Sequence, residues 1–209
     1  MVTMMFPKDN EINYNLSPHS PHSIITNLIP PQTTILDIGC NSGELGKMLK
    51  KKEVTIDGID ISRSLLKKAK PFYRHLYRRD LYQPQPNIPP VKYDFIIMAD
   101  ILEHLPRPDL LLTNLQKYLR PNGQIIISLP NIARLEIRLQ LLLGSFNYAP
   151  GILNPDHLKF FTLKTAKHLL WSTGYSITKV IPTGLGHRLP ILPTLLAFQF
   201  IFIAHVKHT

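Results

Sequence analysis

Cysteine is nearly absent from this sequence, because Cys40 is the only one among 209 residues. A single thiol cannot form a disulfide within the chain, nor can it supply the ligand set of a cysteine-based zinc site. Small folds held together by disulfides or by such a zinc site are therefore excluded. A reducing compartment, the cytoplasm, is the simplest location and the one that we expect.

Segments that would direct the chain into or across a membrane are also lacking. Residues 7–10 interrupt the N-terminus before an apolar signal segment develops, so secretion is not expected. One long uncharged stretch, 189–206, approaches the length that spans a bilayer. Pro190 and Pro193 break its first half, and Gln199 interrupts its second half. The stretch therefore predicts a loop followed by a buried strand, and it leaves open only a peripheral contact with a membrane.

Acidic residues are scarce, since 14 Asp and Glu oppose 24 Lys and Arg and the net charge is +10. Much of the basic charge lies between residues 47 and 79, in or beside two predicted helices. Such charge can bind the backbone of a nucleic acid, but it is more often a solvated face. We expect this face on the half of the sheet away from the substrate, so nucleic acid is not an expected partner.

Hydrophobic residues make up 44% of the chain, which is enough for the core of one domain. From Thr33 onward, short apolar runs alternate with segments of helical period, a pattern typical of parallel strands joined by crossover helices. The sequence thus predicts an α/β fold. The expected strands cover 33–39, 54–60, 75–79, 93–99, 123–129, 175–181 and 198–206. The expected helices cover 43–52, 62–70, 108–119 and 163–173, with Ser62 and Thr162 as N-caps and Gly174 after the last.

The domain organisation is expected to be simple. Residues 1–32 form an N-terminal leader and cap segment with a short helix at 20–28, and residues 33–209 form the main domain. An insertion at about 131–160 carries one amphipathic helix, IARLEIRLQLLL. The 19 prolines cluster at 84–90, 106–108 and 182–193, where they indicate loops.

The segment from Ile35 to Gly46, ILDIGCNSGELG, has the pattern of a strand that enters a glycine-bearing turn and then a helix. Ligands of open α/β sheets bind at this end of the strands. Gly39 and Gly43 lack the Cβ atom that would block the approach of a cofactor to the backbone. Asp60 ends the second strand about 20 residues on, where a carboxylate can accept hydrogen bonds from both hydroxyls of a ribose. These features favour a nucleoside cofactor.

Residues after the later strands complete a recognisable series. Asp80 follows the third strand, Asp100 ends the fourth within YDFIIMADILEHL, and LRPNGQIIISLPN supplies a turn before the fifth. In this order and spacing, the chain from about Thr33 to Asn131 resembles the class I S-adenosylmethionine-dependent methyltransferases, and Asp37 favours that family over NAD-binding proteins. The SPHS run and NPDHLKFFTLKTAKHLLWSTGYSI look like a bacterial group near ubiquinone-biosynthesis O-methyltransferases and methionine-biosynthesis W-like proteins.

The resemblance implies a Rossmann-like, seven-stranded, mostly parallel sheet with helices on both faces and an antiparallel last strand at about 198–206. It also implies S-adenosylmethionine as cofactor. Glycine-turn residues would line its methionine part, Asp60 its ribose, Asp80 and Leu81 its adenine, and Asp100 the wall beside the sulfonium. The full set of expected cofactor-binding residues is Asp37, Gly39, Cys40, Gly43, Asp60, Ile61, Asp80, Leu81 and Asp100.

Asp100 and His104 are the expected catalytic residues. A sulfonium methyl group is already electrophilic, so the enzyme mainly aligns the acceptor and excludes water. A base is needed only when the accepting atom is a hydroxyl oxygen. His104 is the nearest candidate, because it follows the fourth strand and its unperturbed pKa lies near neutrality. The structural alternative is a histidine that only packs in the loop before Pro106.

A metal site is a further hypothesis for the same segment. Asp100, Glu103 and His104 are spaced i, i+3 and i+4, so they project to one side if this turn is helical. Two carboxylates and an imidazole suit a divalent cation such as Mg²⁺ or Mn²⁺. His157 is the candidate fourth ligand, and the set resembles the metal site of the small-RNA 2′-O-methyltransferases. The alternatives are no metal at all, and a His157 that only anchors the insertion.

The sequence therefore predicts an enzyme that methylates a small molecule, at oxygen, with a glycan, a quinone-like compound or a lipid-linked intermediate as acceptor. The alternatives are an RNA methyltransferase and a non-catalytic module that uses the fold to bind a partner. The fourth strand lacks the Asn/Asp-Pro-Pro-aromatic run of nucleic-acid amine methylases, and the position of Cys40 disfavours a cysteine adduct. Acceptor specificity is expected to reside in 1–32, 131–160 and 183–197.

Overall fold

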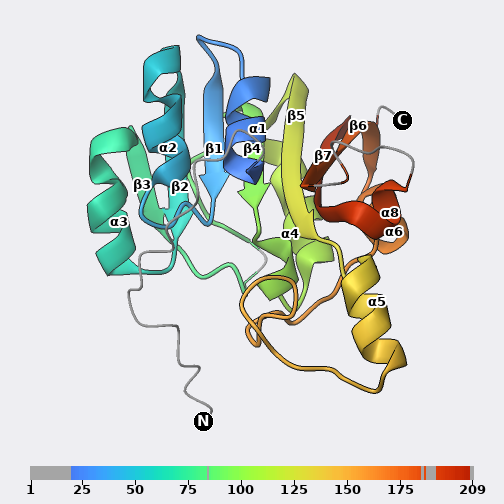
Figure 1. Ribbon diagram of the computed structural model, residues 1–209. Helices are drawn as coiled ribbons and strands as arrows, with labels where there is room; N and C mark the ends of the chain where they lie inside the picture. The colour runs from blue at the N-terminus through green and yellow to red at the C-terminus, as the bar shows by residue number, and fades with distance from the viewer. Residues whose placement is uncertain (1–19, 84, 185, 187–191, 208–209) are drawn as a thin grey trace.

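A seven-stranded sheet forms the centre of the protein (Figure 1). The computed structural model describes residues 20–83, 85–184, 186 and 192–207. The strands are β1 (Thr34–Ile38), β2 (Thr55–Asp60), β3 (His75–Arg78), β4 (Tyr93–Ala99), β5 (Leu119–Pro130), β6 (Tyr175–Gly184) and β7 (Ala197–Val206). Their order is β3-β2-β1-β4-β5-β7-β6, and β7 runs antiparallel to both of its neighbours. The expected seven-stranded, mostly parallel sheet with an antiparallel last strand is confirmed.

Helices cover both faces of this sheet. One face carries α1 (Pro21–Leu28), α2 (Glu44–Leu49) and α3 (Arg63–Ala69), and the other carries α4 (Pro108–Leu115) and α6 (Leu163–Ser172). Short 3₁₀ turns follow α2, α3, β4 and α4 as η1 (Lys50–Lys52), η2 (Lys70–Phe72), η3 (Leu102–His104) and η4 (Gln116–Tyr118). In β1, Ile35 packs on the first face and Leu36 on the second, and both are fully buried. A strand covered on both sides needs this continuous apolar sequence.

The predicted helix caps are confirmed. Ser62 Oγ accepts a hydrogen bond from the Leu65 amide at the start of α3. At α6, Thr162 and Thr165 form a reciprocal capping box, and Gly174 ends the segment with a φ of +82°. These caps satisfy amide groups that the first turn of a helix leaves without partners.

Helix α1 places the predicted cap segment against the main domain. Ile25 and Ile29 are buried in the core beneath α2 and α3. Lys52 Nζ donates hydrogen bonds to the carbonyls of Thr26 and Ile29, at 2.6 and 2.8 Å, and so satisfies the C-terminal end of the helix. The segment from residue 20 onward is therefore integral to the fold.

Two sequence-based expectations about prolines need correction. Pro182 lies inside β6 rather than in a loop, which is possible because β6 is an edge strand and a proline there removes no central hydrogen bond. The Pro-Asn-Gly run at 121–123 lies within β5, where the pairing with β4 shifts register. Residues 185 and 187–191 of the cluster at 182–193 lie outside the described residues, and Pro193 begins the short helix α8 (Pro193–Leu196).

The insertion helix also differs from the expected amphipathic helix. It is α5 (Leu135–Leu142), and it projects away from the sheet (Figure 1). Ile137 is buried, whereas Leu139, Leu142 and Leu143 are 50, 81 and 84% exposed. The leucines therefore do not form a single buried stripe, because no second element of the described chain covers the outer side of α5.

The C-terminal apolar stretch forms a core strand, as predicted. Phe200, Ile201, Phe202 and Ala204 are buried in β7, which pairs with β5 on one side and β6 on the other. None of the helices in the described part of the chain is long and apolar enough to cross a membrane.

Candidate functional site

The predicted site residues meet where the order of the strands reverses. Connections run outward in opposite directions from β1 and β4, which are neighbours in the sheet. The carboxyl ends of adjacent parallel strands with this connectivity leave a crevice that binds ligands in open α/β sheets. Gly39 follows β1, Asp60 ends β2 and Asp100 follows β4. The structure therefore brings these three predicted residues to one edge.

The glycine turn after β1 is held by the backbone of β2. The amides of Gly39 and Cys40 both donate hydrogen bonds to the Ile59 carbonyl, at 2.8 and 2.9 Å. Gly39 has a φ of +75°, and a Cβ atom there would collide with the side chain of Ile101. Gly43 has a φ of +92°, and a Cβ atom would lie 2.9 Å from the Cα of Ala69 in α3. Gly43 is thus required for packing against α3, a reason that its sequence pattern did not indicate.

Asp37 and Cys40 lie beneath this turn. Cys40 is 5% exposed, and burial raises the pKa of its thiol. Its side chain is therefore an unreactive part of the core. Asp37 is 3% exposed and accepts a 2.6 Å hydrogen bond from the Tyr73 hydroxyl, which in turn accepts one from the Gly46 amide. Burial raises the pKa of Asp37 to about 7 and outweighs the opposing effect of the Tyr73 hydrogen bond. The side chains of both residues stabilise the turn from within the core.

The raised pKa of Asp37 predicts a pH-dependent stability. The folded state holds a proton that the unfolded state releases near pH 4, so this residue's contribution to stability falls as pH rises from about 4 to about 7. Asp37→Asn removes that titration and keeps an acceptor for Tyr73. Between pH 5 and 8 we expect the free energy of unfolding of Asp37→Asn to gain about 1–3 kcal/mol relative to wild type, at roughly 1.4 kcal/mol per pH unit. Urea unfolding at each pH measures it, and a constant difference would contradict the assignment.

Asp60 is oriented by two backbone amides. Its Oδ2 accepts a hydrogen bond from the Asn41 amide, and its Oδ1 accepts one from the Ser62 amide, at 2.9 and 2.8 Å. Burial raises its pKa, and these bonds partly oppose that rise. Each carboxylate oxygen keeps a second lone pair for another donor. The neighbouring Asp57 is instead fully buried and taken up by a bidentate ion pair with Arg74, so it is no substitute for Asp60.

The remaining predicted cofactor residues lie beside Asp60. Arg79 donates its amide to the Asp60 carbonyl, which places the next residue, Asp80, at the same edge of the sheet. Asp80 is exposed, and its Oδ1 accepts a hydrogen bond from the Tyr82 amide. Leu81 packs partly against the core, and Ile61 is 39% exposed. These residues therefore form a partly exposed, partly apolar surface beside the Asp60 carboxylate.

Asp100 is fixed by partners from the far half of the sheet. Its Oδ1 accepts hydrogen bonds from Ser128 Oγ in β5 and Gln199 Nε2 in β7, at 2.6 and 2.7 Å. Its φ of +56° is unusual for a residue other than glycine. In the sequence, Gln199 is recognisable only as an interruption of an apolar stretch, and nothing in the sequence pointed to Ser128. A polar residue within an otherwise apolar strand was the signal for Gln199.

Helix α1 brings His22 to the same crevice. Burial lowers the pKa of its imidazole, while the nearby carboxylates of Asp100 and Glu44 oppose that effect. The His22 imidazole is therefore subject to the charges of both carboxylates. His22 lies two residues after the NLSPHS run at 15–20, and no role was expected for it from the sequence.

Glu103, His104 and His157 converge in a second group beside the crevice. One carboxylate oxygen of Glu103 and one ring nitrogen of each histidine lie within 4.8 Å of one another. Glu103 is 1% exposed, and its pKa is raised well above the usual value by burial and then by the charge of Asp100. Asp100 does not join the group, because its φ of +56° precedes the 3₁₀ turn η3 and its Oδ1 is directed to β5 and β7. The expected alignment of four ligands is therefore wrong, and three of the four residues come together.

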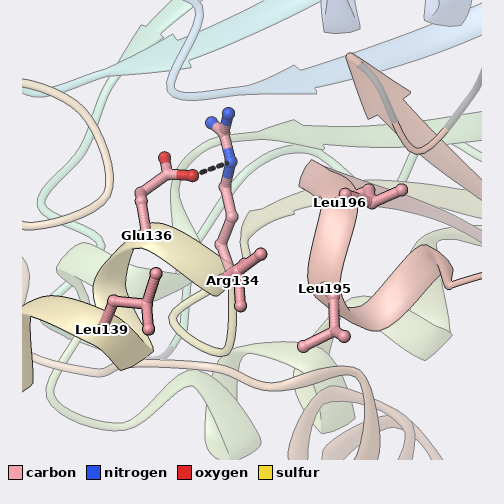
Figure 2. A pocket seen from close by; sticks show the side chains of 6 residues that line it. Arg134, Glu136, Leu139, Leu195 and Leu196 are labelled. Atoms are coloured by element: carbon pink, nitrogen blue, oxygen red, sulfur yellow. Dashed lines mark ion pairs between the residues drawn. The ribbon is translucent and has the colours of Figure 1, made fainter. Parts of the chain in front are cut away.

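An apolar groove lies between α5 and α8 (Figure 2). It has a volume of about 240 Å³ and is lined by Arg134, Leu135, Glu136, Leu139, Leu195 and Leu196. Arg134 and Glu136 form an ion pair of 2.7 Å at one side, while leucines from both helices form the walls. The groove thus joins the two segments, 131–160 and 183–197, in which acceptor specificity is expected.

The basic residues between 47 and 79 lie on or beside α2, α3 and β3, at the opposite end of the sheet from β5, β6 and β7. Some of them have partners within the chain. Lys52 binds carbonyls of α1 and its C-cap, and Arg74 pairs with Asp57. Arg78 and Arg79 donate hydrogen bonds to backbone carbonyls. The expected separation between this basic face and the segments after β5 is present in the fold.

Residues 14–180 match a methyltransferase domain family. A ubiquinone biosynthesis O-methyltransferase from Coxiella burnetii is 31% identical in an alignment of 104 residues that covers 46% of this chain and 43% of that protein. This chain thus spans less than half the length of the curated relatives that it matches.

Solved structures share the fold. The PH0226 protein of Pyrococcus horikoshii has a TM-score of 0.69 at 15% identity, with 97% of both chains covered. Magnesium protoporphyrin IX methyltransferase from Synechocystis, solved with bound SAH, has a TM-score of 0.60 at 19% identity and covers 88% of this chain and 78% of its own. At these identities the likeness confirms the expected Rossmann-like fold.

Proposed function

Because this chain belongs to the methyltransferase domain family, as its resemblance to class I methyltransferases predicted, we propose that it transfers the methyl group of S-adenosylmethionine to an oxygen of a small-molecule acceptor. The observation that carries this proposal is the single edge at which the Gly39 turn, the Asp60 carboxylate and the Asp100 carboxylate meet. We further propose that it acts in the cytoplasm, where the buried thiol of Cys40 stays reduced.

The residues at this edge fit the cofactor. Asp60 has one backbone amide on each oxygen, and it retains lone pairs for the two hydroxyls of a ribose. The Gly39 turn offers backbone close to the methionine part, and Asp80, Leu81 and Ile61 would receive the adenine. When bound, the cofactor supplies an electrophilic methyl group on a positively charged sulfur. Asp100, held rigidly by Ser128 and Gln199, places negative charge beside that position.

Transfer to oxygen requires that the acceptor hydroxyl lose its proton. The group of Glu103, His104 and His157 lies next to Asp100, whose charge raises the pKa of Glu103. Its polar atoms support a role in this step for the group. We assign that role to His104, which stays the proposed catalytic residue.

Removal of the Asp60 carboxylate tests the cofactor assignment. We expect Asp60→Ala to weaken S-adenosylmethionine binding by about 10–100-fold, because hydrogen bonds to charged groups contribute about 1.5–3 kcal/mol. Isothermal titration measures the affinity. Asp109→Ala is the matched control, since the Asp109 carboxylate pairs with Arg107 at the start of α4. Unchanged affinity in a folded Asp60→Ala protein would overturn the ribose assignment.

The apolar groove predicts an acceptor with an apolar part. Leu139→Asp places a charge in the groove, so we expect KM for such an acceptor to rise about 10-fold while kcat changes little. Leu142→Asp is the control on the same helix, because Leu142 is 81% exposed and does not line the groove. Equal effects of both substitutions would argue against a role for the groove.

The activity is tested with labelled S-adenosylmethionine and a panel of phenols, quinols, glycans, lipid-linked sugars and RNA. We expect label on an oxygen of a small molecule with an apolar substituent. Label on RNA would contradict the proposed acceptor class. Tight cofactor binding without transfer to any extracted metabolite would instead support the non-catalytic interaction module.

A further inference from the structure

We propose that Glu103, His104 and His157 bind one divalent transition-metal ion of the zinc type, with coordination positions left open for oxygen. The ion site stands on geometry alone, whereas its use for an acceptor oxygen rests on the proposed methyl transfer. Its three ligands form a set of two imidazoles and one carboxylate.

The distances suit a compact ion. Three candidate donor atoms, one from each residue, lie within 4.8 Å of one another. Nitrogen and oxygen ligands bind zinc at about 2.0–2.2 Å, so bound ligands lie up to roughly 4 Å apart. Small side-chain rotations therefore close the three atoms around an ion. The histidine rings already meet edge to face, with centroids 4.8 Å apart.

In both histidines, Nδ1 contacts a backbone carbonyl. His104 Nδ1 lies 3.1 Å from the Asp156 carbonyl, and His157 Nδ1 lies 3.0 Å from the Ile152 carbonyl. A carbonyl oxygen only accepts hydrogen bonds, so each Nδ1 must carry the hydrogen. The Nε2 atom of each neutral ring then has a free lone pair. Ligands of protein-bound metals are held in this way, with the second ring nitrogen donating to a carbonyl or carboxylate.

Glu103 supplies the observation that points most directly to an ion. It is 1% exposed, and neither of its carboxylate oxygens has a hydrogen-bond partner in the described structure. A buried polar group without a partner costs about 1–3 kcal/mol, and more when it is charged. A bound cation satisfies this carboxylate and compensates the negative charge of nearby Asp100.

The ligand types select the ion. With Asp100 directed to Ser128 and Gln199, only one carboxylate remains in the set. Mg²⁺ and Ca²⁺ prefer oxygen ligands, whereas imidazole suits zinc and its first-row neighbours. Three protein ligands leave at least one position open, as in catalytic zinc sites. The hard cation expected from the sequence is thus replaced by a zinc-type ion.

The open position gives the ion a role in transfer to oxygen. A hydroxyl that binds such an ion has a much lower pKa and loses its proton to water near neutral pH. The oxygen lone pair is then available to form the new bond to the methyl carbon. His104 contributes by holding the ion, so its Nε2 does not need to act as a free base.

Metal binding by the full chain tests the site without an acceptor. The protein is stripped with a chelator, titrated with Co²⁺ under visible absorption, and loaded with Zn²⁺ for elemental analysis. We expect one ion per chain and no competition from equimolar Mg²⁺. Glu103→Gln and His157→Gln should each weaken binding by more than the 10–100-fold that loss of an outer-shell partner causes. His168→Gln, on α6 beside Trp171, is the matched control and should bind normally.

A second measurement protects the test against unfolded variants. In wild type labelled with ¹⁵N at histidine, Zn²⁺ should shift the Nε2 resonances of His104 and His157 and leave their Nδ1–H signals in place. Absence of stoichiometric binding, unchanged Nε2 signals, or Mg²⁺ binding of equal strength would overturn the inference. A loaded protein that transfers no methyl group would count against the proposed function only, and transfer by a metal-free protein would remove the ion's proposed role.

Discussion

Deletion of residues 189–209 is expected to unfold the domain, because it removes β7 from between β5 and β6. The deletion takes away the buried side chains of Phe200, Ile201 and Phe202, each of which contributes about 1.5–3 kcal/mol on burial. Together with the lost strand pairing, this is comparable to the roughly 5–15 kcal/mol that stabilises a typical domain. Loss of the cooperative urea transition, followed by circular dichroism, is the expected result.

Two further chains make this experiment specific. Deletion of residues 208 and 209 alone should leave the transition unchanged, because the strand ends at Val206. Phe202→Ala should shift the transition without abolishing it, at a cost of about 3–5 kcal/mol. If the chain that ends at residue 188 kept a cooperative transition and bound S-adenosylmethionine, β7 would not be an essential part of the core.

Gly39→Val is expected to abolish cofactor binding, with a loss of affinity of at least about 100-fold, or roughly 3 kcal/mol. A β-branched residue is strained at a φ of +75°, and its Cβ would collide with Ile101. The turn must then move away from the crevice. Gly144→Val is the matched control, because Gly144 has a similar φ of +72° but nothing within 4 Å of the added atom.

Isothermal titration of both glycine variants separates the effect of backbone strain from the effect of blocking the approach of the cofactor to the Gly39 turn. We expect Gly144→Val to bind S-adenosylmethionine with wild-type affinity. Its free energy of unfolding should fall less than that of Gly39→Val. Normal binding by Gly39→Val would mean that the cofactor does not approach this turn closely. An added Ile101→Ala substitution should recover part of the stability of Gly39→Val, since it removes the contacting side chain.

The sheet could be predicted from local sequence because each strand carries its own signal. Both faces of β1 are buried, so its residues form an apolar run, and caps such as Ser62 and Thr162 need only neighbours three residues away. The exposure of the α5 leucines could not be predicted from local sequence in this way. Its leucines repeat with a helical period, but whether a surface covers them depends on other parts of the chain.

The site was only partly predictable for the same reason. Asp60 could be placed at the crevice because its position at the end of a strand determines where it lies. The partner of Asp100, Gln199, is 99 residues away, and spacing within a turn cannot reveal such a contact. Asp100 also has a positive φ, and no glycine at this position indicated such a conformation in the sequence. The predicted four-ligand alignment failed because it assumed a regular helix that begins at this residue.

The insertion returns to η3 through the amides of Leu158 and Lys159, which both donate hydrogen bonds to the Glu103 carbonyl, at 2.8 and 3.0 Å. These bonds hold the end of the insertion beside η3, where the rings of His157 and His104 meet edge to face with centroids 4.8 Å apart. Glu103 therefore contacts the insertion twice, through its backbone carbonyl, which accepts the two amides, and through its side chain, which lies with the two histidines. The position of the insertion and the geometry of this group are thus set by the same residue of η3.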